Sequence, residues 1–539
     1  MKKPHFVLSL IGVAVVAFML GSLTTHEGYA VDDIYQKIGL FSQVLKLVDA
    51  NYVEKVDPGE LIYGAIDGML RSLDPHSNFL SKESFTQMSE DFSGQFSGIG
   101  IEFDIINEYL TVIAVIEGSP SEEVGLRPGD RITKINGESS IGIKEDEVRA
   151  KLRGEKGTKV LVTIEREGES DPVNLTITRN RVPIRSIKAA FMLDTQTGYI
   201  QLRRFAKTTS QDLEDALNKL EGQGMKRLVL DLRQNSGGYL DQAVEVTNKF
   251  INGGKVIVST RGRTRTSNQE YVATESAAHP PYPLIVLIDH QTASASEIVA
   301  GAIQDWDRGL IVGTRSFGKG LVQSLFTEPY LRDGSALKLT TAKYYTPSGR
   351  LIQREYKGKN WRDYIDEAFE DGDEPLNRTG ENTPAEADSA QNAPTFKTRN
   401  LGRTVYGGGG IMPDVTVKSP KRAYPFASKL RGRAFFEFAT HYAATHRDLK
   451  KDFTTFLTSF VVDDEMLKGF KDQMKKQGVT FTENDFQADA DYVKLQLKRA
   501  IASNLWGEEE GYKVAVRGDV QLQEGLKLFT THSLLVNAK

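Results

Sequence analysis

The chain has 539 residues, of which 39% are hydrophobic and 26% are charged, and it contains no cysteine. This length predicts several domains with sizeable cores, and the lack of cysteine excludes disulfides, thiolate catalysis and cysteine-ligated zinc. A net charge of −4 argues against a nucleic-acid-binding protein. None of the eight histidines lies in an H-E-x-x-H spacing, so we expect no zinc-protease site. We also expect no other metal and no cofactor.

The N-terminal residues have the pattern of an export segment. Two lysines precede an apolar run from Phe6 to Leu23, an order typical of a signal peptide, and Gly28 and Ala30 supply the small residues of a cleavage site. The run also approaches the length that spans a bilayer. Residues 1–30 are therefore interpreted as either a cleaved signal peptide or an uncleaved membrane anchor, and in both cases the rest of the chain is exported.

A helical arm is expected over residues 31–84. Apolar residues recur at helical spacing from Ile34 to Val48. A second helix is predicted from Pro58 to Leu73, because proline is well tolerated in the first helical turn.

Residues 85–180 carry the pattern of a small β-domain that binds peptide tails. Gly98, Ile99 and Gly100 form a glycine loop directly before an alternating run, Ile101–Ile105. The order of elements is similar to a PDZ domain of the permuted bacterial kind. Such a loop offers backbone N–H groups to a terminal carboxylate, while the peptide tail adds to the sheet as an extra strand. The alternative is a β-domain that only packs against its neighbours.

A mixed α/β body is predicted over residues 181–420, because strand and helix patterns alternate. The predicted strands are Thr197–Ile200 and Arg227–Leu232, and the predicted helices are Ser210–Glu221, with Ser210 as its cap, and Asp241–Phe250. Gly237 lies in a glycine turn after the second strand, where the backbone can approach a bound carbonyl closely. The plain alternative is an ordinary strand-to-helix turn.

The stretch 283–326 has the most informative order of elements. It contains three strand-like runs, one helix and one glycine-rich loop, which are Leu284–Ile288, Leu310–Val312, Leu321–Phe326, a helix that includes Ile298–Trp306, and loop 313–320. Ser294 would lie at the start of the helix, where unpaired N–H groups and the helix dipole favour a nucleophile whose attack creates an oxyanion. A serine hydroxyl needs a base. Lys319 lies in the loop among mostly uncharged neighbours, as a neutral amine would require.

Three other interpretations of these residues stay open at this point. Ser294 and Glu297 have the spacing of a helix capping box. Residues 313–319 have the spacing of a phosphate loop, but Gly320 stands where a magnesium-binding hydroxyl is needed, and a strand-like run follows instead of a helix. His290 could serve a Ser-His-Asp triad, although the aspartate beside it would point the other way if the strand continues.

Several ordered motifs are similar to those of a known family. They are Thr-Ala-Ser-Ala-Ser-Glu at 292–297, Gln-Asp-Trp at 304–306, Phe-Gly-Lys-Gly at 317–320 and the long motif at 334–350. Together they resemble the carboxyl-terminal processing peptidases, also called tail-specific proteases, and the resemblance extends from Tyr35 to Val417. It implies a crotonase-like peptidase core and a helical arm that contributes to dimerisation and to covering the active site.

The resemblance also implies roles for individual residues. These are Ser294 as the nucleophile, Lys319 as the general base, Gln323 as the residue that orients the lysine, Gly237 and Ala295 as N–H donors of the oxyanion hole, and Asp305 and Glu297 in supporting roles.

Two later segments differ from the rest in composition. Residues 355–396 are acidic and polar, which predicts a flexible insertion. The four glycines at 407–410 predict a backbone that passes close to the core. Residues 421–539 predict a helical C-terminal extension without site chemistry, for which oligomerisation or adaptor docking is the expected role. Its predicted helices are Phe435–Ala444, Glu465–Lys476, Asn484–Ala502 and Val520–Phe529.

These patterns predict an α/β multidomain protein with a helical N-terminal arm, a PDZ β-domain, a mixed α/β peptidase core and a helical C-terminal extension. We expect an exported serine endopeptidase with a Ser-Lys dyad, which recognises protein C-terminal tails and processes or degrades exported proteins. The expected partners are such tails, an adaptor protein and further copies of the chain, without nucleic acid. The expected location is the periplasm, either soluble after signal cleavage or anchored to the inner membrane. The alternative function is a non-catalytic PDZ scaffold or chaperone on a peptidase-like fold.

Overall fold

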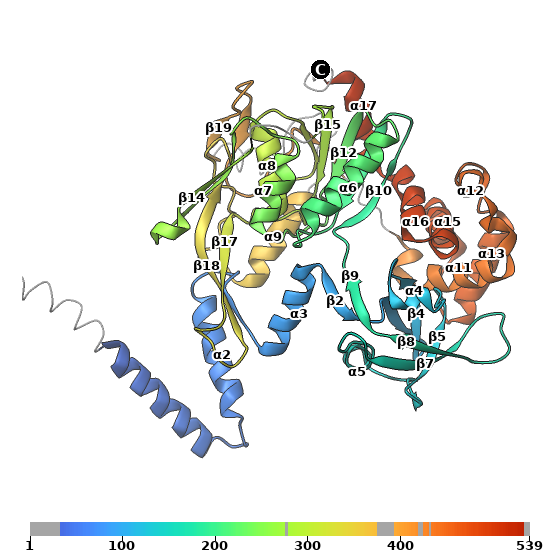
Figure 1. Cartoon of the computed structure of the whole chain (residues 1–539), viewed down its shortest axis with the longest axis horizontal. Coiled ribbons are helices and arrows are strands. Elements are labelled where there is room, and N and C mark those ends of the chain that lie inside the picture. Colours follow the sequence, from blue (N-terminus) through green and yellow to red (C-terminus); the bar gives the residue numbers. More distant parts are fainter. Residues whose placement is uncertain (1–32, 275–278, 374–392, 419–423, 431–432, 533–539) are drawn as a thin grey trace, which may run out of the picture. The chain divides into compact units, whose positions relative to one another are not determined.

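The computed structural model describes residues 33–274, 279–373, 393–418, 424–430 and 433–532, which Figure 1 draws in colour. The chain divides into two compact units, Met1–Phe79 and Leu80–Lys539. The predicted signal peptide or anchor, residues 1–30, lies outside the described residues. Within the described part of the chain, no helix combines the length and the apolar character needed to cross a membrane.

The first unit contains two helices where helices were predicted. One covers residues 33–51, and the second, α2, spans Pro58–Arg71. Asp57 caps α2, because its Oδ1 atom accepts a hydrogen bond from the Gly59 N–H at 2.7 Å and so satisfies a donor of the first turn. Pro58 begins the helix, where its missing N–H costs no helical hydrogen bond.

The predicted PDZ region forms a sheet of its own in the second unit. Strands follow the order β3-β4-β5-β7-β8, with β6 paired to β5, and β2 pairs with β9 where the chain enters and leaves the region. Helices α3, α4 and α5 accompany the strands. The bounds are α3 Lys82–Ser93, β2 Gln95–Gly98, β3 Ile101–Ile106, β4 Tyr109–Val115, α4 Pro120–Glu123, β5 Arg131–Ile135, β6 Glu138–Ser139, α5 Glu145–Leu152, β7 Lys159–Glu165, β8 Val173–Thr178 and β9 Asn180–Pro183.

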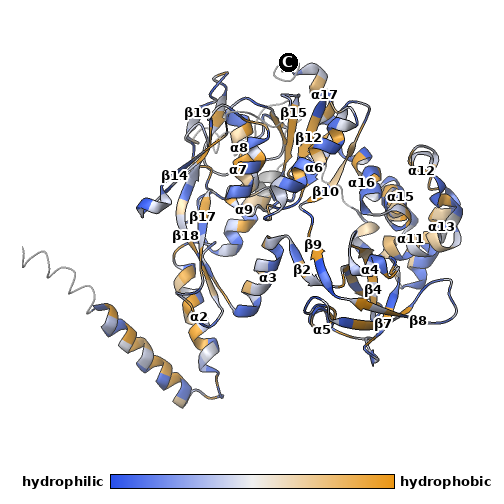
Figure 2. Ribbon diagram, viewed as in Figure 1, coloured by the Kyte–Doolittle hydropathy of each residue, from blue (hydrophilic) through white to orange (hydrophobic). Residues whose placement is uncertain are grey.

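The predicted mixed α/β body, residues 181–420, is called the catalytic body here because it carries the predicted catalytic residues. It is built on a six-stranded sheet of order β10-β11-β12-β15-β16-β21. Its strands are β10 Ile187–Met192, β11 Thr197–Leu202, β12 Arg227–Asp231, β15 Leu284–Ile288, β16 Leu310–Gly313 and β21 Val415–Thr416. All neighbouring pairs are parallel except β10 with β11. Every residue of β11 and β15 is buried, as expected for parallel strands covered on both faces, and Figure 2 shows the hydrophobic colour running along β12 and β15.

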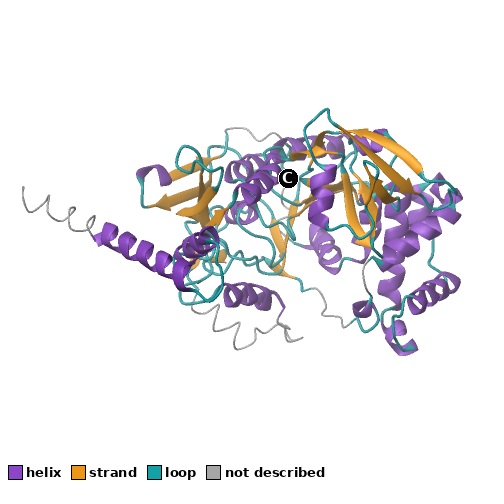
Figure 3. Ribbon diagram, turned by 90° about the horizontal axis from the view of Figure 1, so that it is seen from below, coloured by secondary structure: helices purple, strands orange, loops and turns teal. Residues whose placement is uncertain are grey.

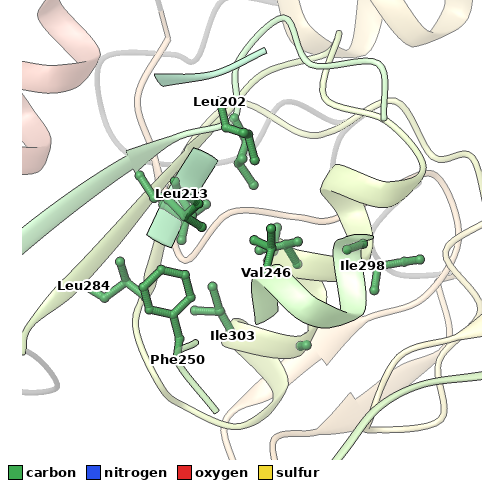
Figure 4. Packing of buried hydrophobic residues seen from close by; sticks show 14 of the residues in the cluster. Leu202, Leu213, Val246, Phe250, Leu284, Ile298 and Ile303 are labelled. Carbon is green, nitrogen blue, oxygen red and sulfur yellow. The ribbon is translucent and has the colours of Figure 1, made fainter. Parts of the chain in front are cut away.

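Helices α6 (Thr209–Gly222), α7 (Leu240–Asn248) and α8 (Ala295–Asp305) contribute to the large core beside this sheet. Figure 4 shows Leu213, Val246 and Ile298 from these helices in one buried cluster with Leu284 of β15 and Phe250; Leu213 lies beside Leu284, and Ile298 lies at the other end of the cluster. The mixed α/β prediction is confirmed. The predicted cap is wrong, because α6 begins at Thr209 and Ser210 therefore lies inside the first turn.

A second sheet pairs β17 with β18, β18 with β13 and β13 with β14. The bounds are β13 Val256–Gly262, β14 Gln269–Val272, β17 Leu321–Phe326 and β18 Ala336–Tyr345. After β18 the structure differs from the predicted flexible insertion, since residues of its first half form a helix, α9 (Trp361–Asp373), in which Tyr364 and Ala368 are buried. Residues 374–392 lie outside the described residues, and a hairpin of β19 (Thr395–Lys397) and β20 (Thr404–Tyr406) follows them.

The described part of the C-terminal extension contains helices and no strand (Figure 3). The helices are α11 Ala434–Thr445, α12 Phe453–Ser459, α13 Asp464–Lys476, α14 Glu483–Ala488, α15 Ala490–Trp506, α16 Glu508–Ala515 and α17 Val520–Thr531. Three of the four predicted helices are confirmed. The fourth, Asn484–Ala502, is wrong as a single helix, because the chain breaks at Asp489, whose Oδ2 atom accepts hydrogen bonds from the N–H groups of Phe426 and Ala427 at 2.9 and 2.8 Å.

The last part of the extension belongs to the catalytic body rather than to a separate domain. Leu522 and Phe529 of α17 share a buried cluster with Tyr199, Ile285 and Leu287 on the strands. This cluster lies on the face of the sheet opposite the α6–α8 core, because alternate side chains of a strand point to opposite faces. The catalytic sheet is thus covered on its second face by residues far downstream in the sequence.

Candidate active site

Three neighbouring parallel strands end at the same edge of the catalytic sheet. β12 pairs with β15, and β15 pairs with β16. Because the three run in the same direction, the segments that leave their carboxyl ends meet, as in other open α/β sheets. Those segments are the turn with Gly237, the turn with Ser294 and the loop with Lys319, so the sheet order itself gathers the predicted catalytic residues.

Ser294 occupies a strained turn directly before α8. Its φ of 56° and ψ of −114° lie outside the favoured regions for a residue with a side chain. Two contacts hold the turn: the Ala293 N–H donates to the Asn235 carbonyl at 3.0 Å, and the Tyr344 hydroxyl donates to the Ser294 carbonyl at 3.1 Å. Such strain costs about 1–3 kcal/mol and is concentrated at functional sites. It presents a half-buried serine at the first turn of a helix.

Glu297 connects the serine turn to the lysine loop. Its Oε2 atom accepts hydrogen bonds from the N–H groups of Ser294 at 2.8 Å and Lys319 at 2.9 Å. Its Oε1 atom accepts from the Gly318 N–H at 2.8 Å and the Ser316 hydroxyl at 2.5 Å. Since two backbone nitrogens share one oxygen, the backbone of Ser294 lies next to that of Lys319.

The carboxyl group of Glu297 has no exposed surface. Burial raises its pKa, while the hydrogen bonds from Ser316, Lys319, Ser294 and Gly318 act in the opposite direction. The capping-box prediction therefore describes only part of its role, because the same carboxyl group that reaches back to the N-cap also fixes a loop that follows another strand.

Glycines allow the loop that carries Lys319, residues 313–320, to lie against the loop that contains the four glycines at 407–410. A Cβ atom at Gly318 would lie 2.8 Å from the Gly410 nitrogen, and one at Gly410 would lie 2.3 Å from the Ser316 carbonyl oxygen. The predicted close passage of the four glycines at 407–410 is thus confirmed. Lys319 itself is half-buried, and the next element is strand β17, so the loop lacks the helix N-terminus that a phosphate loop uses.

Gly237 lies against the serine turn. A Cβ atom there would lie 2.9 Å from both the Ser294 Cβ atom and the Ala295 nitrogen, and its φ of 99° also favours glycine. The Gly237 N–H donates to the Asn235 Oδ1 atom at 2.9 Å. An oxyanion that uses this N–H has to share it with Asn235 or displace the amide oxygen.

Gln323 and Asp305, the remaining predicted residues of the catalytic body, lie on different elements. Gln323 is on β17, and its amide nitrogen donates to the Leu321 carbonyl and to the Thr340 hydroxyl, both at 3.3 Å. Asp305 ends α8, about 16 Å from its start at the usual helical rise. It pairs with the fully buried Arg350 at 2.8 Å, so it supports the far end of the helix that carries Ser294.

His290 has a different neighbour from the one a catalytic triad requires. Its ring packs on Phe369 of α9, with centroids 4.6 Å apart. The Oδ1 atom of Asp289 accepts hydrogen bonds from the N–H groups of Gln234, Gln291 and Thr292, at 3.0, 3.0 and 3.1 Å. Asp289 therefore serves the turns around the site, which leaves the triad interpretation without geometric support.

The predicted carboxylate loop lies beside the edge strand β3 of the PDZ sheet. Gly98 ends β2, the Ile99 carbonyl accepts from the Ser121 N–H at 2.9 Å, and the Gly100 carbonyl accepts from the Ile116 N–H at 3.0 Å. Gly100 has a φ of 85°, and a Cβ atom there would lie 2.2 Å from the Ser119 Cβ atom. The loop therefore requires glycine at this position.

Sequence reasoning missed three side chains that shape the site. Asn235 holds the glycine turn from both sides, because its amide nitrogen also donates to the Leu202 carbonyl at 2.8 Å. An asparagine two residues before Gly237 is a common signal for such a turn. Tyr344 and Ser316 gave no signal, since their contacts come from elements distant in sequence. Among the described residues, no cluster of His, Cys, Asp or Glu side chains is placed to hold a metal ion.

Profiles of known families match several regions of the chain. The sequence profile of peptidase family S41 matches residues 196–358, and a PDZ-domain profile matches residues 111–166. The profile of the N-terminal domain of the activating protease CtpB matches residues 22–84, and a family of unknown function, DUF8443, matches residues 428–507. Fold and matches together define a serine-type peptidase with a PDZ domain.

Individual relatives extend over most of this region. A carboxy-terminal-processing protease of Bartonella bacilliformis is 39% identical over 356 residues, which are 65% of this chain and 80% of that protein. The carboxy-terminal processing protease CtpA of Bacillus subtilis is 33% identical over 65% of this chain and 74% of its own length. Among solved structures, a photosystem II D1 C-terminal processing protease is 30% identical over 58% of this chain and 89% of that chain, with a TM-score of 0.32. The chain belongs to the family of carboxy-terminal processing proteases.

Proposed function

We propose that this protease cleaves peptide bonds with a Ser-Lys dyad, in which Ser294 is the nucleophile and Lys319 is the general base. The observation that carries the proposal is the shared oxygen of Glu297, which accepts hydrogen bonds from the N–H groups of both residues. One buried carboxyl group thus fixes the nucleophile turn and the base loop against each other. Gln323, on the strand that follows the loop, is the proposed orienting residue.

The chemistry follows from these positions. The neutral Lys319 amine takes the proton of the Ser294 hydroxyl while Oγ attacks the scissile carbonyl carbon. The N–H groups of Ala295 and Gly237 stabilise the oxyanion. The protonated lysine then gives its proton to the leaving amine, and an acyl-enzyme remains. Water loses a proton to Lys319 and attacks the ester, and the lysine then returns this proton to the leaving Ser294 Oγ atom as the new C-terminal carboxylate is released.

The proposed substrates are proteins that present a free C-terminal tail. Gly98, Ile99 and Gly100 would receive the terminal carboxylate, and the tail would pair with β3, the edge strand of the PDZ sheet. The apolar run of residues 6–23 supports export, with a periplasmic location either in soluble form or at the inner membrane. An adaptor protein and self-association are further proposed partners.

The test replaces Ser294 with Ala and Lys319 with Ala and follows cleavage of an unfolded protein with an apolar tail. Each change should abolish cleavage, and a serine-directed covalent probe should label Ser294 only when Lys319 is present. Binding of a tail peptide should survive in both variants. The controls are Ser210→Ala, a serine in the first turn of α6, and Lys226→Ala, an exposed lysine of the same body. Cleavage that persists in Ser294→Ala would overturn the dyad, and a wild-type chain that binds tails without cleaving them would identify a scaffold.

A further inference from the structure

Helix α9 packs on the loop that carries Lys319. The helix begins at Trp361 and therefore lies outside the segment matched by the peptidase profile, which ends at residue 358. Its buried side is formed by Tyr364 and Ala368, which are 1% exposed. These two residues lie one turn apart and therefore on one face of the helix. The buried side chains of Tyr364 and Ala368 therefore anchor α9 to the rest of the body.

The first contact joins α9 to the loop through an aromatic pair and a glutamine. The Tyr364 ring meets the Phe317 ring edge to face, with centroids 5.6 Å apart. The Gln353 amide nitrogen donates to the Tyr364 hydroxyl at 3.2 Å, while its oxygen accepts from the Gly320 N–H at 2.8 Å. Tyr364 therefore contacts the loop directly at Phe317, before Lys319, and is linked through Gln353 to Gly320, after it.

The second contact runs through a buried arginine. Arg354 is 2% exposed, its Nε atom donates to the Phe317 carbonyl at 3.0 Å, and its N–H donates to the Gly318 carbonyl at 2.8 Å. Its Nη1 atom lies 3.7 Å from the Glu367 carboxylate of α9. Arg354 thus binds two consecutive carbonyls of the loop, one through its guanidinium and one through its backbone N–H, and the guanidinium also faces a carboxylate of the helix.

A third contact reaches the nucleophile side of the site. Phe369, one turn after Ile365, packs on the ring of His290, which lies two residues after the end of β15 and before the Ser294 turn. The helix therefore contacts the segments that lead to both members of the dyad.

We propose that α9 is a positioning element for the catalytic lysine, with Tyr364 and Glu367 as its positioning residues. The inference rests on the proposed role of Lys319. The loop from Thr314 to Gly320 has no regular hydrogen-bonded structure of its own, so its shape depends on what surrounds it. Glu297 holds it from the serine side, and α9 holds it from the opposite side through Gln353 and Arg354. A misplacement of a catalytic group by about 1 Å costs about 100-fold in rate.

The test measures kcat and KM in Tyr364→Ala, Tyr364→Phe and Glu367→Gln, each checked for an unchanged fold. We expect Tyr364→Ala to lower kcat by about 10- to 100-fold while KM changes less than about twofold, because tail binding occurs in the PDZ domain. Tyr364→Phe keeps the ring contact and should recover most of the rate. The pH dependence of kcat should shift in Tyr364→Ala, since it reports the ionisation of the base. The matched control is Asp366→Ala, which removes an exposed carboxylate of the same helix.

The outcomes separate the inference from the proposed function. If Lys319→Ala is inactive but Tyr364→Ala and Glu367→Gln match the control in kcat and pH profile, α9 only covers the body and the inference is wrong. If Lys319→Ala retains full kcat, the base assignment fails and the positioning role fails with it. If Tyr364→Ala is too unstable to measure, Glu367→Gln decides: an unchanged kcat and pH profile contradict the inference, and a lowered kcat with a shifted profile supports it.

Discussion

Glu297 shows how much of the site depends on one side chain. Its two oxygens accept four hydrogen bonds from residues that belong to two separate segments. A buried acceptor with several donors is costly to remove, because each unpaired donor costs about 1–3 kcal/mol. Its conservative variant Glu297→Gln should therefore destabilise the fold and misplace both members of the proposed dyad.

The pH dependence of stability provides a separate test of Glu297. Its pKa is raised by burial above the ordinary value of 4.5, so the folded chain binds the proton more tightly than the unfolded chain. The contribution to stability is fully present below pH 4.5 and is lost as the pH rises through the raised pKa. We expect the free energy of unfolding of the wild type, relative to Glu297→Gln, to fall over this range. Denaturant unfolding at a series of pH values measures it, and parallel curves for the two proteins would contradict the prediction.

Gly237 is the second residue whose replacement gives a clear expectation. A Cβ atom there meets the Ala293 carbonyl at 2.8 Å and the Ser294 Cβ atom at 2.9 Å, so Gly237→Ala should displace the serine turn. We expect kcat to fall by about 100- to 1000-fold, the usual effect of losing an oxyanion donor. Gly253→Ala is the control, because Gly253 has a φ of 73° but no atom within 4 Å of a Cβ position. Equal losses in both variants would mean that backbone strain alone, and not the contact with Ser294, is responsible.

At the scale of single elements, the sequence predicted best where turn residues bound a strand-like run. β15 and β16 are fully buried, and β15 has the predicted bounds while β16 differs by one residue, because continuous apolar runs between turn residues define buried strands. β17 also has the predicted bounds, and it is only partly buried. The break between α14 and α15 was not predictable. At the break, the Asp489 carboxylate accepts hydrogen bonds from the N–H groups of Phe426 and Ala427, which are distant in sequence.

The candidate site was predictable to a similar degree and for a similar reason. Motif order pointed to Ser294 and Lys319 as the proposed dyad, and strand order explains why the segments that carry them lie together. The link through Glu297 and the packing of α9 were not predictable, because acidic composition around residue 364 favours disorder and two buried side chains give a weak helical signal. Contacts between distant segments, rather than local propensity, determine the link through Glu297 and the packing of α9.

Arg233 connects the C-terminal extension to the turn that carries Gly237. It leaves β12 and pairs with the Asp231 carboxylate at 2.6 Å, and its guanidinium also donates to both oxygens of Asp519 at 2.6 and 3.1 Å. Asp519 caps α17, since it accepts from the Leu522 N–H at 3.0 Å. One ion pair therefore joins the last described helix to the glycine turn.

Replacement of Asp519 by Ala tests this connection. The change removes the cap of α17 and leaves Arg233 with fewer acceptors, and we expect a loss of about 1–3 kcal/mol in the free energy of unfolding. Because the side chains of Arg233 and Asp519 are partly exposed, we expect a loss of stability toward the lower end of that range. Glu524→Ala, which removes an exposed ion pair of the same helix, should change stability by less than about 0.5 kcal/mol. Equal effects in the two variants would contradict a specific role for the pair.

At the scale of the second unit, the C-terminal extension has two distinct parts. The helices α11–α15 share a core of their own that includes Phe438, Phe456 and Phe470. They also contact the PDZ sheet, where Arg433 pairs with Asp104 at 2.9 Å. The helix α17 instead completes the catalytic body. The helix α16 belongs to both parts, because Val514 lies in the helical core and Tyr512 packs against the cluster on the sheet. The extension is therefore connected both to the PDZ sheet and to the catalytic body.

A chain that ends at Gly507 would lack α16 and α17 and should expose the apolar side chains of Ile285 and Leu287. We expect it to bind a hydrophobic dye, to lose its cooperative unfolding transition and to show no proteolysis. A chain that ends at His532 retains α17 and serves as the control. A Gly507-ended chain with the melting temperature and activity of the control would show that this cover is dispensable.

The position of α17 has a consequence for the timing of activity during synthesis. β15 and Ser294 leave the ribosome long before α17 does, and domains form as their residues become available. Until α17 has been made, the sheet beneath the nucleophile lacks its second cover, and the Arg233 side chain lacks Asp519. We therefore expect that an unfinished polypeptide cannot cleave its neighbours, and that proteolytic competence begins only once translation has passed α17.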